Sequence, residues 1–212
     1  MIGDGVGIIN AISGFTDAKN LEEPACTTLK VSSRDLRMRR KALRKYYVAN
    51  NHSLPEKVFL YRDGVGDGQI HYVKDQEVTL VQKACEEVVL KENAKQPIKL
   101  AFIIVTKKVN MRIFKGAPDS KLSNPDPGTV VDTVVTRPER YDFYLVPQFV
   151  NQGTVTPVCY NLAFKLCHLY YNWQGTVRVP APCQYAHKLA FMVAQSIHRE
   201  VNEELRSKLF FL

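Results

Sequence analysis

The stretch Val58-Phe-Leu-Tyr-Arg-Asp-Gly-Val-Gly-Asp-Gly-Gln69 decides the fold of this chain. Its first four residues are apolar or aromatic without a polar break, which is typical of a strand buried on both faces of a sheet. The run then ends in a loop: Arg62 and Asp63 come first, and glycines at positions 64, 66 and 68 allow a sharp turn and leave little side-chain bulk around the acid. The stretch therefore predicts an acid at the end of a buried strand, where α/β folds commonly place their chemistry.

A purely structural interpretation of the same stretch stays open. Asp-Gly after a strand is often only a turn. The glycine spacing matches a phosphate-binding loop weakly, because the Lys-Ser/Thr pair of a P-loop is missing. Evidence from other parts of the chain is needed to decide whether this stretch is only a turn or a functional site.

The segments around this stretch predict an α/β sheet. Ser32 or Ser33 can cap a helix that runs to about residue 50, with Leu36, Leu43 and Tyr47 on one side. After the glycines, the apolar residues of segment 74–92 recur at helical spacing, and segment 99–105 is the most apolar run of the chain. Strand, helix and strand in this order predict a right-handed crossover between two parallel strands.

The second half of the chain is predicted to add strands and two helices. Residues 116–128, with three prolines, are expected to form a long loop. His187 is expected in the first turn of the last helix, where the positive helix end disfavours the imidazolium form, although a lone histidine near a helix start is usually structural. The predicted strands are 129–135, 141–146, one beginning at 156–160, and one ended by the prolines at 180 and 182; the predicted helices are 162–171 and 183–198.

Composition is that of an ordinary globular domain. The 212 residues are 45% hydrophobic and 24% charged, and no apolar run approaches the ~18 residues that a membrane helix needs. Five cysteines without a framework of spacings indicate reduced thiols and, with no signal-peptide pattern, an intracellular protein. A zinc site made of Cys167, His168, Cys183 and His187 is a weak alternative, because these spacings are not those of zinc sites.

The net charge of +8 is concentrated in one segment. Residues 30–45 contain eight basic residues and one acid, Asp35, which leaves about +1 for the rest of the chain. Such a patch is a plausible surface for phosphate contacts, and a solvated helix face is the equally plausible alternative. Lys107, Lys108 and Arg112, after the second apolar strand, predict a further cationic rim.

Several strings of this chain together resemble the Piwi domain of the PIWI subfamily of Argonaute proteins. The resemblance covers roughly residues 54–212, in the order of the family. The strings are Tyr61-Arg-Asp-Gly-Val-Gly-Asp-Gly-Gln69, Pro127-Gly-Thr-Val-Val-Asp132, Thr136-Arg-Pro-Glu139, Tyr141-Asp-Phe-Tyr144, Leu166-Cys-His168, Tyr170-Tyr-Asn-Trp173, the segment 178–191 around Pro180-Ala-Pro-Cys183, and Leu209-Phe-Phe-Leu212.

The resemblance implies an RNase H-like α/β fold, with a mixed, largely parallel sheet flanked by helices, that holds a small guide RNA paired to a target RNA. In the members that cleave RNA, an Asp-Glu-Asp-His set holds two Mg²⁺ or Mn²⁺ ions, which stabilise the attacking and leaving oxygens of the phosphodiester. Asp63 matches the second aspartate of this set and His187 its histidine, so both are predicted as catalytic and metal-binding residues.

Two ligands of the set and one connection are unmatched. Nothing in residues 1–57 reproduces the Gly-x-Asp context of the first aspartate, and Asp35 is the only acid near the position expected for the glutamate. At Asn161 the chain passes from strand to helix without the loop of the family. We therefore expect an incomplete Piwi domain over residues 30–212, after a divergent segment 1–29, with an internal deletion near Asn161.

The expected function is binding of piRNA-type guide and target RNA in gene silencing, through contacts that recognise A-form shape. The alternatives are a competent Mg²⁺-dependent endoribonuclease, with ligands such as Asp4, Asp17 or Asp35, and an interaction module for Tudor-domain proteins that does not bind RNA. The resemblance also implies a cytoplasmic location in perinuclear germ granules, with the nucleus as an alternative. The predicted RNA contacts are Lys107, Lys108, Arg112, Arg178, Gln195 and the carboxylate of Leu212.

Overall fold

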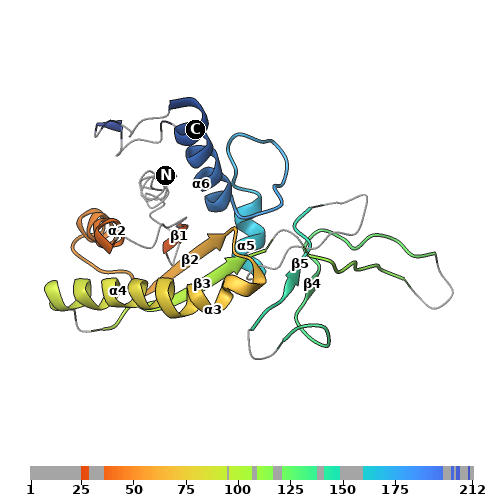
Figure 1. The fold of residues 1–212 in the computed structure, drawn as a ribbon, viewed down its shortest axis with the longest axis horizontal. Helices are drawn as coiled ribbons and strands as arrows, with labels where there is room; N and C mark the ends of the chain where they lie inside the picture. The colour runs from red at the N-terminus through yellow and green to blue at the C-terminus, as the bar shows by residue number, and fades with distance from the viewer. Residues whose placement is uncertain are drawn as a thin grey trace.

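A three-stranded parallel sheet forms the centre of the molecule (Figure 1). The computed structural model describes residues 25–28, 36–94, 96–106, 109–116, 121–137, 141–148, 160–197, 202, 204–205 and 210. The strands β1 (Ala25–Thr28), β2 (Lys57–Asp63) and β3 (Lys99–Val105) lie in the order of the sequence. Asp63 pairs in register with Val105, so the two strands end at the same edge. The predicted parallel pair and α/β class are confirmed.

Strand β1 was not predicted. Its sequence, Ala-Cys-Thr-Thr, is neither a continuous apolar run nor a clear alternation, and it pairs with β2 in parallel over its whole length. Pairing with β2 holds this segment as a strand, because tertiary contacts commonly override the weak propensity of a short segment.

One face of the sheet is covered by α2 (Leu36–Ala49) and α4 (Thr79–Lys91), as Figure 1 shows. Leu60 of β2 packs there with Val81 and Cys85 of α4. Arg40 of α2 pairs with Glu87 of α4, with Nη2 2.5 Å from Oε2. Helix α2 confirms the described part of the helix predicted to run to residue 50; residues 29–35 lie outside the described ranges.

The helix predicted over 74–92 begins earlier than expected. Directly after the glycine loop come a 3-10 turn η1 (Asp67–Gln69), α3 (Ile70–Tyr72) and a π-helical segment η2 (Val73–Val78), which leads into α4. The buried residues of η2 are Val73 and Glu77. A charged residue at a buried position interrupts the apolar spacing, which explains why the sequence pattern did not show this start.

The other face of the sheet carries α5 (Tyr160–Cys167), α6 (Ala181–Phe191) and an antiparallel pair, β4 (Val130–Val131) with β5 (Tyr144–Leu145). Their side chains meet Tyr61 and Val105 in one cluster. The cluster also contains Leu145, Ala163, Val179 and Cys183. The sheet is therefore packed on both faces, as the apolar composition of β2 predicted.

The strands of the second half are shorter than predicted. Residues 133–136 form bends, and Val134 has φ +68 and is 99% exposed, so the strand predicted over 129–135 ends at Val131. The strand predicted to be ended by the prolines at 180 and 182 does not form, since residues 174–180 contain bends but no strand. The predicted loop 116–128 is closed by a bridge between Lys115 and Ser123.

The boundaries of the last helices also differ from the predictions. Tyr160 belongs to α5 and not to a strand, and α5 ends at Cys167 instead of residue 171. The strand predicted to begin at 156 lies, up to residue 159, outside the described ranges. Helix α6 begins at Ala181, because proline is compatible with a first helical turn, and continues as the π-helical segment η4 (Met192–Ile197). No helix in the described ranges is both long and apolar enough to cross a membrane.

Candidate functional site

The carboxyl edge of the sheet presents Asp63 beside an open glycine loop. Asp63 is the last residue of β2 and is 8% exposed. Gly64 has φ +76, a conformation that side chains disfavour, and a Cβ built at Gly64, Gly66 or Gly68 meets no atom within 4 Å. The loop therefore makes the sharp turn that the sequence predicted and leaves room for a ligand backbone.

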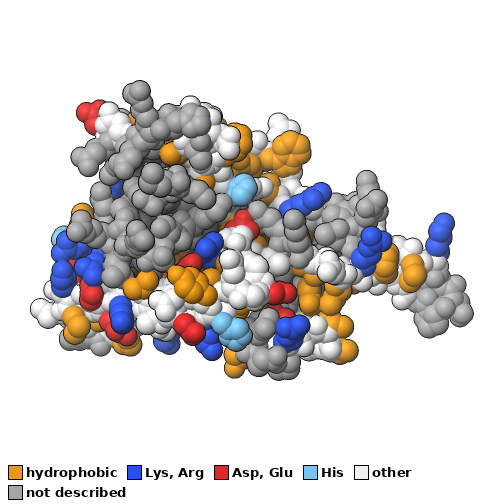
Figure 2. Space-filling view, in the orientation of Figure 1, with side chains coloured by type: hydrophobic (Ala, Val, Ile, Leu, Met, Phe, Trp, Pro, Cys, Tyr) orange, Lys and Arg blue, Asp and Glu red, His pale blue; other side chains and the backbone are white. Residues whose placement is uncertain are grey.

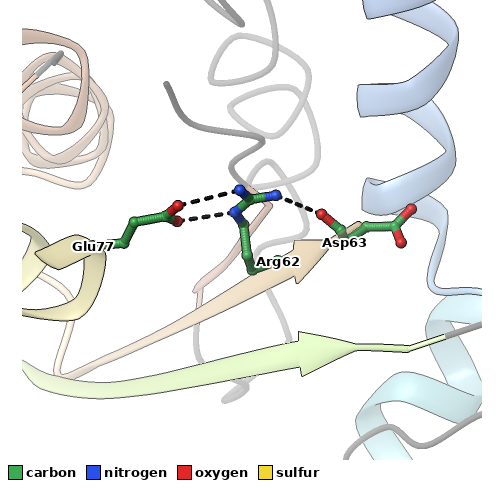
Figure 3. Close-up of polar contacts among 3 residues, drawn as sticks. All are labelled: Arg62, Asp63 and Glu77. Atoms are coloured by element: carbon green, nitrogen blue, oxygen red, sulfur yellow. Dashed lines mark hydrogen bonds and ion pairs between the residues drawn. The ribbon is translucent and has the colours of Figure 1, made fainter. Parts of the chain in front are cut away.

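Neighbouring residues of β2 point to opposite faces of the sheet. Tyr61 and Asp63 lie on the face covered by α6, and Tyr61 packs in the same cluster as Cys183 of that helix. Figure 3 shows the carboxylate of Asp63 pointing away from Arg62, toward the helix drawn in pale blue, which is α6. The strand thus presents its acid to α6 and its arginine to the opposite face.

His187 lies on α6, and its side chain is exposed. It is the seventh residue of the helix, so the prediction that it lies in the first turn is wrong, and the helix terminus has less influence on its charge than expected. His187 follows Cys183 by one turn, and residues four apart share one side of a helix. The packing of Cys183 against β2 therefore puts Asp63 and His187 on two elements that contact each other.

Arg62 and Glu77 form a bidentate ion pair behind Asp63 (Figure 3). Arg62 Nε donates to Glu77 Oε2 at 2.9 Å and Nη2 donates to Oε1 at 3.2 Å. Arg62 Nη1 donates to the backbone oxygen of Asp63 at 2.5 Å. The pair was not predicted, although the sequence carries a signal for it: an arginine inside a buried strand needs a buried acceptor, and Glu77 takes the buried position between Val73 and Val81.

The predicted cationic residues are only partly described. Arg112 and Arg178 are both exposed. The Gln148 amide, oriented so that both of its ends are paired, donates to the backbone oxygen of Thr176 at 2.8 Å and accepts from Arg178 Nε at 3.0 Å. Gln195 is exposed on η4. Lys107, Lys108 and Leu212 lie outside the described ranges.

Basic side chains gather over α2 on the face drawn in Figure 2, and others recur along the part of the molecule that carries β4 and β5. Arg44 of α2 is exposed, and Arg40 is paired with Glu87. The predicted basic segment is thus partly used to attach α2 to α4. Whether the rest contacts phosphate or only solvent stays a prediction.

The described residues do not complete a metal site. Mg²⁺ takes several oxygen ligands, and no three His, Cys, Asp or Glu side chains of the described ranges gather where they could hold a metal ion. The same finding makes the zinc alternative wrong, since all four of its residues are described. Asp4, Asp17 and Asp35 lie outside those ranges.

Burial dominates the chemistry of the neighbouring thiols. Cys85, Cys167 and Cys183 are buried and form no disulfide with one another. Burial raises the pKa of the Cys167 thiol to about 12. A neutral buried thiol is a poor nucleophile and a poor metal ligand, so Cys167 is part of the packing and not of the site.

Parallel strands, helices on both faces and an acid at the carboxyl end of the middle strand define an α/β domain with an acid at one end of its sheet. Comparison with protein families identifies it further: the model of the Piwi domain matches residues 12–198. The chain belongs to the Piwi family. The match includes β1 and α2, upstream of the region where the resemblance was clearest in the sequence.

Individual relatives and structures agree with this assignment. The chain is 47% identical over 183 residues to Piwi-like protein 1 of Danio rerio, covering 79% of this chain and 21% of that protein. The crystal structure of Drosophila Piwi matches with a TM-score of 0.66 at 38% identity, covering 81% of this chain and 25% of that one. The Argonaute of Kluyveromyces polysporus, solved with a guide RNA, shares the fold with a TM-score of 0.62 at 22% identity, covering 82% and 26%.

Proposed function

We propose that this chain binds a small guide RNA paired to target RNA, as a PIWI-type domain of the piRNA silencing pathway. The observation that carries the proposal is membership of the Piwi family together with the glycine loop at the carboxyl edge of the sheet, where no described atom lies within 4 Å of a Cβ built at Gly64, Gly66 or Gly68. The solved Argonaute that shares the fold was crystallised with a guide RNA, which supports the same class of ligand. The chain spans 21% of the length of its Danio rerio relative, so the proposal concerns this domain alone.

The exposed cations and the glycine loop of the domain are suited to contacts with the sugar-phosphate backbone of RNA. Exposed guanidinium groups such as Arg112 and Arg178 contact phosphates without reading bases. An open glycine loop allows close approach of a sugar-phosphate backbone. Sequence selection is then left to pairing between guide and target, and the protein recognises A-form geometry.

Binding is tested with labelled duplexes. An RNA guide-target duplex and a DNA duplex of the same sequence are titrated with the chain at several salt concentrations. We expect tighter binding of RNA than of DNA, with affinity that falls linearly on a log-log plot against salt, because phosphate contacts release counterions. Unmeasurable RNA binding, or binding that salt does not change, would remove the proposal.

A second candidate function, endonucleolytic cleavage of the paired RNA, is favoured by one observation: Asp63 lies buried at the strand end with its carboxylate toward α6. The described residues contain no group of three His, Cys, Asp or Glu side chains that could hold a metal ion. We therefore propose binding as the main function. Incubation with guide, target and Mg²⁺ tests this: product formed by the wild-type chain and absent with Asp63→Ala would make cleavage the better description.

A further inference from the structure

Asp63 and Glu77 are the two buried charged side chains in the described ranges, with 8% and 4% exposure, and Arg62 contacts both residues. Burial of a carboxylate is costly unless hydrogen bonds compensate for its lost hydration. Both oxygens of Glu77 accept hydrogen bonds from Arg62, at 2.9 and 3.2 Å. Glu77 is thus directed at the arginine, although it is an acid close to the candidate site.

The third contact of Arg62 reaches the main chain at the point where the strand becomes the loop. Its Nη1 donates to the backbone oxygen of Asp63 at 2.5 Å. This oxygen belongs to the peptide group between Asp63 and Gly64, and Gly64 carries the positive φ of +76. The planar guanidinium therefore connects η2, through Glu77, with the peptide that sets the direction of the turn.

We propose that Arg62 is a positioning residue for Asp63 and that Glu77 acts through Arg62. The guanidinium fixes the peptide plane after Asp63, so the carboxylate on the other face of β2 is held toward α6. Glu77 is accordingly not a metal-ligand glutamate, since both of its oxygens are engaged by the arginine. The inference rests on the proposed function in one respect: Asp63 is taken to be the acid of the RNA-binding site.

The competing explanation is that the pair only attaches β2 to η2. Arg62→Met with Glu77→Leu separates the two, because apolar residues of similar volume often replace a buried ion pair without loss of stability. The double variant keeps packing but removes the guanidinium that donates to the backbone oxygen of Asp63. Arg40→Met with Glu87→Leu is the matched control, since it removes an ion pair that joins α2 to α4 and involves neither β2 nor the glycine loop.

The measurement is NMR of the full chain, without RNA. The reporters are the amide nitrogen of Gly64, which senses a hydrogen bond to the preceding carbonyl, and the carboxylate carbon of Asp63. In Arg62→Met/Glu77→Leu we expect both resonances to move by more than the linewidth, with those of α2 and β1 unchanged. In the control we expect α2 and α4 resonances to move and the Gly64 and Asp63 resonances to stay.

Arg62→Lys is a second test, because a lysine keeps the charge opposite Glu77 but lacks the fork that also reaches the Asp63 oxygen. We expect it to move the same two resonances as the double variant. Unchanged Gly64 and Asp63 resonances in both variants would overturn the proposal. Shifts throughout the sheet would overturn it as well, because they would show a general structural role.

RNA-duplex affinity of the same samples separates this inference from the proposed function. A wild-type chain that fails to bind RNA removes the proposed function but leaves the NMR result decisive for Arg62. A chain that binds RNA, with unchanged Gly64 and Asp63 resonances in the variants, removes the positioning role alone.

Discussion

At the scale of single residues, Gly64 is the position where backbone conformation limits the sequence most clearly. Its φ of +76 places it in the left-handed region, and the space around it is open. A side chain there meets strain from its own backbone and not from its neighbours. Gly66, two residues later, has φ -80 and equally open surroundings.

Gly64→Ala should therefore lower the free energy of unfolding by about 1–2 kcal/mol, the usual cost of a left-handed L-residue. Gly66→Ala is the matched control and should be neutral or stabilise the fold by about 0.4–1 kcal/mol, through lower entropy of the unfolded chain. Urea unfolding measures both. Equal effects of the two substitutions would show that the strain is not specific to Gly64.

The Cys167 thiol predicts a pH dependence of stability. Its pKa is raised to about 12 in the folded chain by burial, whereas an unfolded thiol ionises near pH 8.5. The neutral form is favoured by folding, so its contribution is fully present below about pH 8.5 and is lost as pH rises toward 12.

Between pH 8.5 and 10.5 we expect this one group to reduce the free energy of unfolding by up to about 1.4 kcal/mol per pH unit. Cys167→Ala should reduce the slope over this range, whatever its effect at neutral pH. Urea unfolding at four pH values provides the measurement. If the free energy of unfolding falls with pH equally steeply in Cys167→Ala and in the wild type, the Cys167 thiol is not the source of the pH dependence.

At the scale of secondary-structure elements, the sheet depends on apolar contacts between β2 and α4. Leu60 is 1% exposed and packs on Val81 and Cys85, whereas Leu90 of α4 is 74% exposed. Replacing each leucine by alanine therefore compares the loss of a core side chain with the loss of a surface side chain.

Leu60→Ala should cost about 2–5 kcal/mol, because it loses buried surface and leaves a cavity. Leu90→Ala should stay within about 0.5 kcal/mol. Thermal and urea unfolding of both variants check this difference. A small effect at Leu60 would contradict the packing of α4 on β2.

The elements also show what the sequence could and could not predict. Strands β2 and β3 and helices α2 and α4 have continuous apolar runs or helical spacing, and these patterns predicted them. Strands β4 and β5 lie within the strands predicted over 129–135 and 141–146 but are shorter than predicted. Strand β1 was not predicted, because it pairs with a strand distant in sequence and its short segment carries little local signal. At the site, Asp63 was placed correctly at a strand end, whereas the Arg62–Glu77 pair was missed because the arginine was taken with the loop.

At the scale of the whole molecule, the end of the sheet where β2 and β3 begin carries different side chains from the end where these strands finish, which is its carboxyl edge. Lys57 and Lys99 are exposed and face each other in register where β2 and β3 begin. Asp63 and the glycine loop lie at the edge where these strands end, and the segment with Arg112 follows the end of β3. If RNA lies along the carboxyl edge, as we propose, cations of equal charge at the two edges should differ in their effect.

The most direct measurement of this claim is the salt dependence of RNA-duplex affinity in two double variants. For Arg112→Ala/Arg178→Ala we predict weaker binding and a log-log salt slope smaller by about 1 for each arginine removed. For Lys57→Ala/Lys99→Ala, which removes the same charge from the end of the sheet where β2 and β3 begin, we predict affinity and slope like those of the wild type. Equal losses in both variants, or a loss confined to the lysine variant, would contradict binding at the carboxyl edge of the sheet.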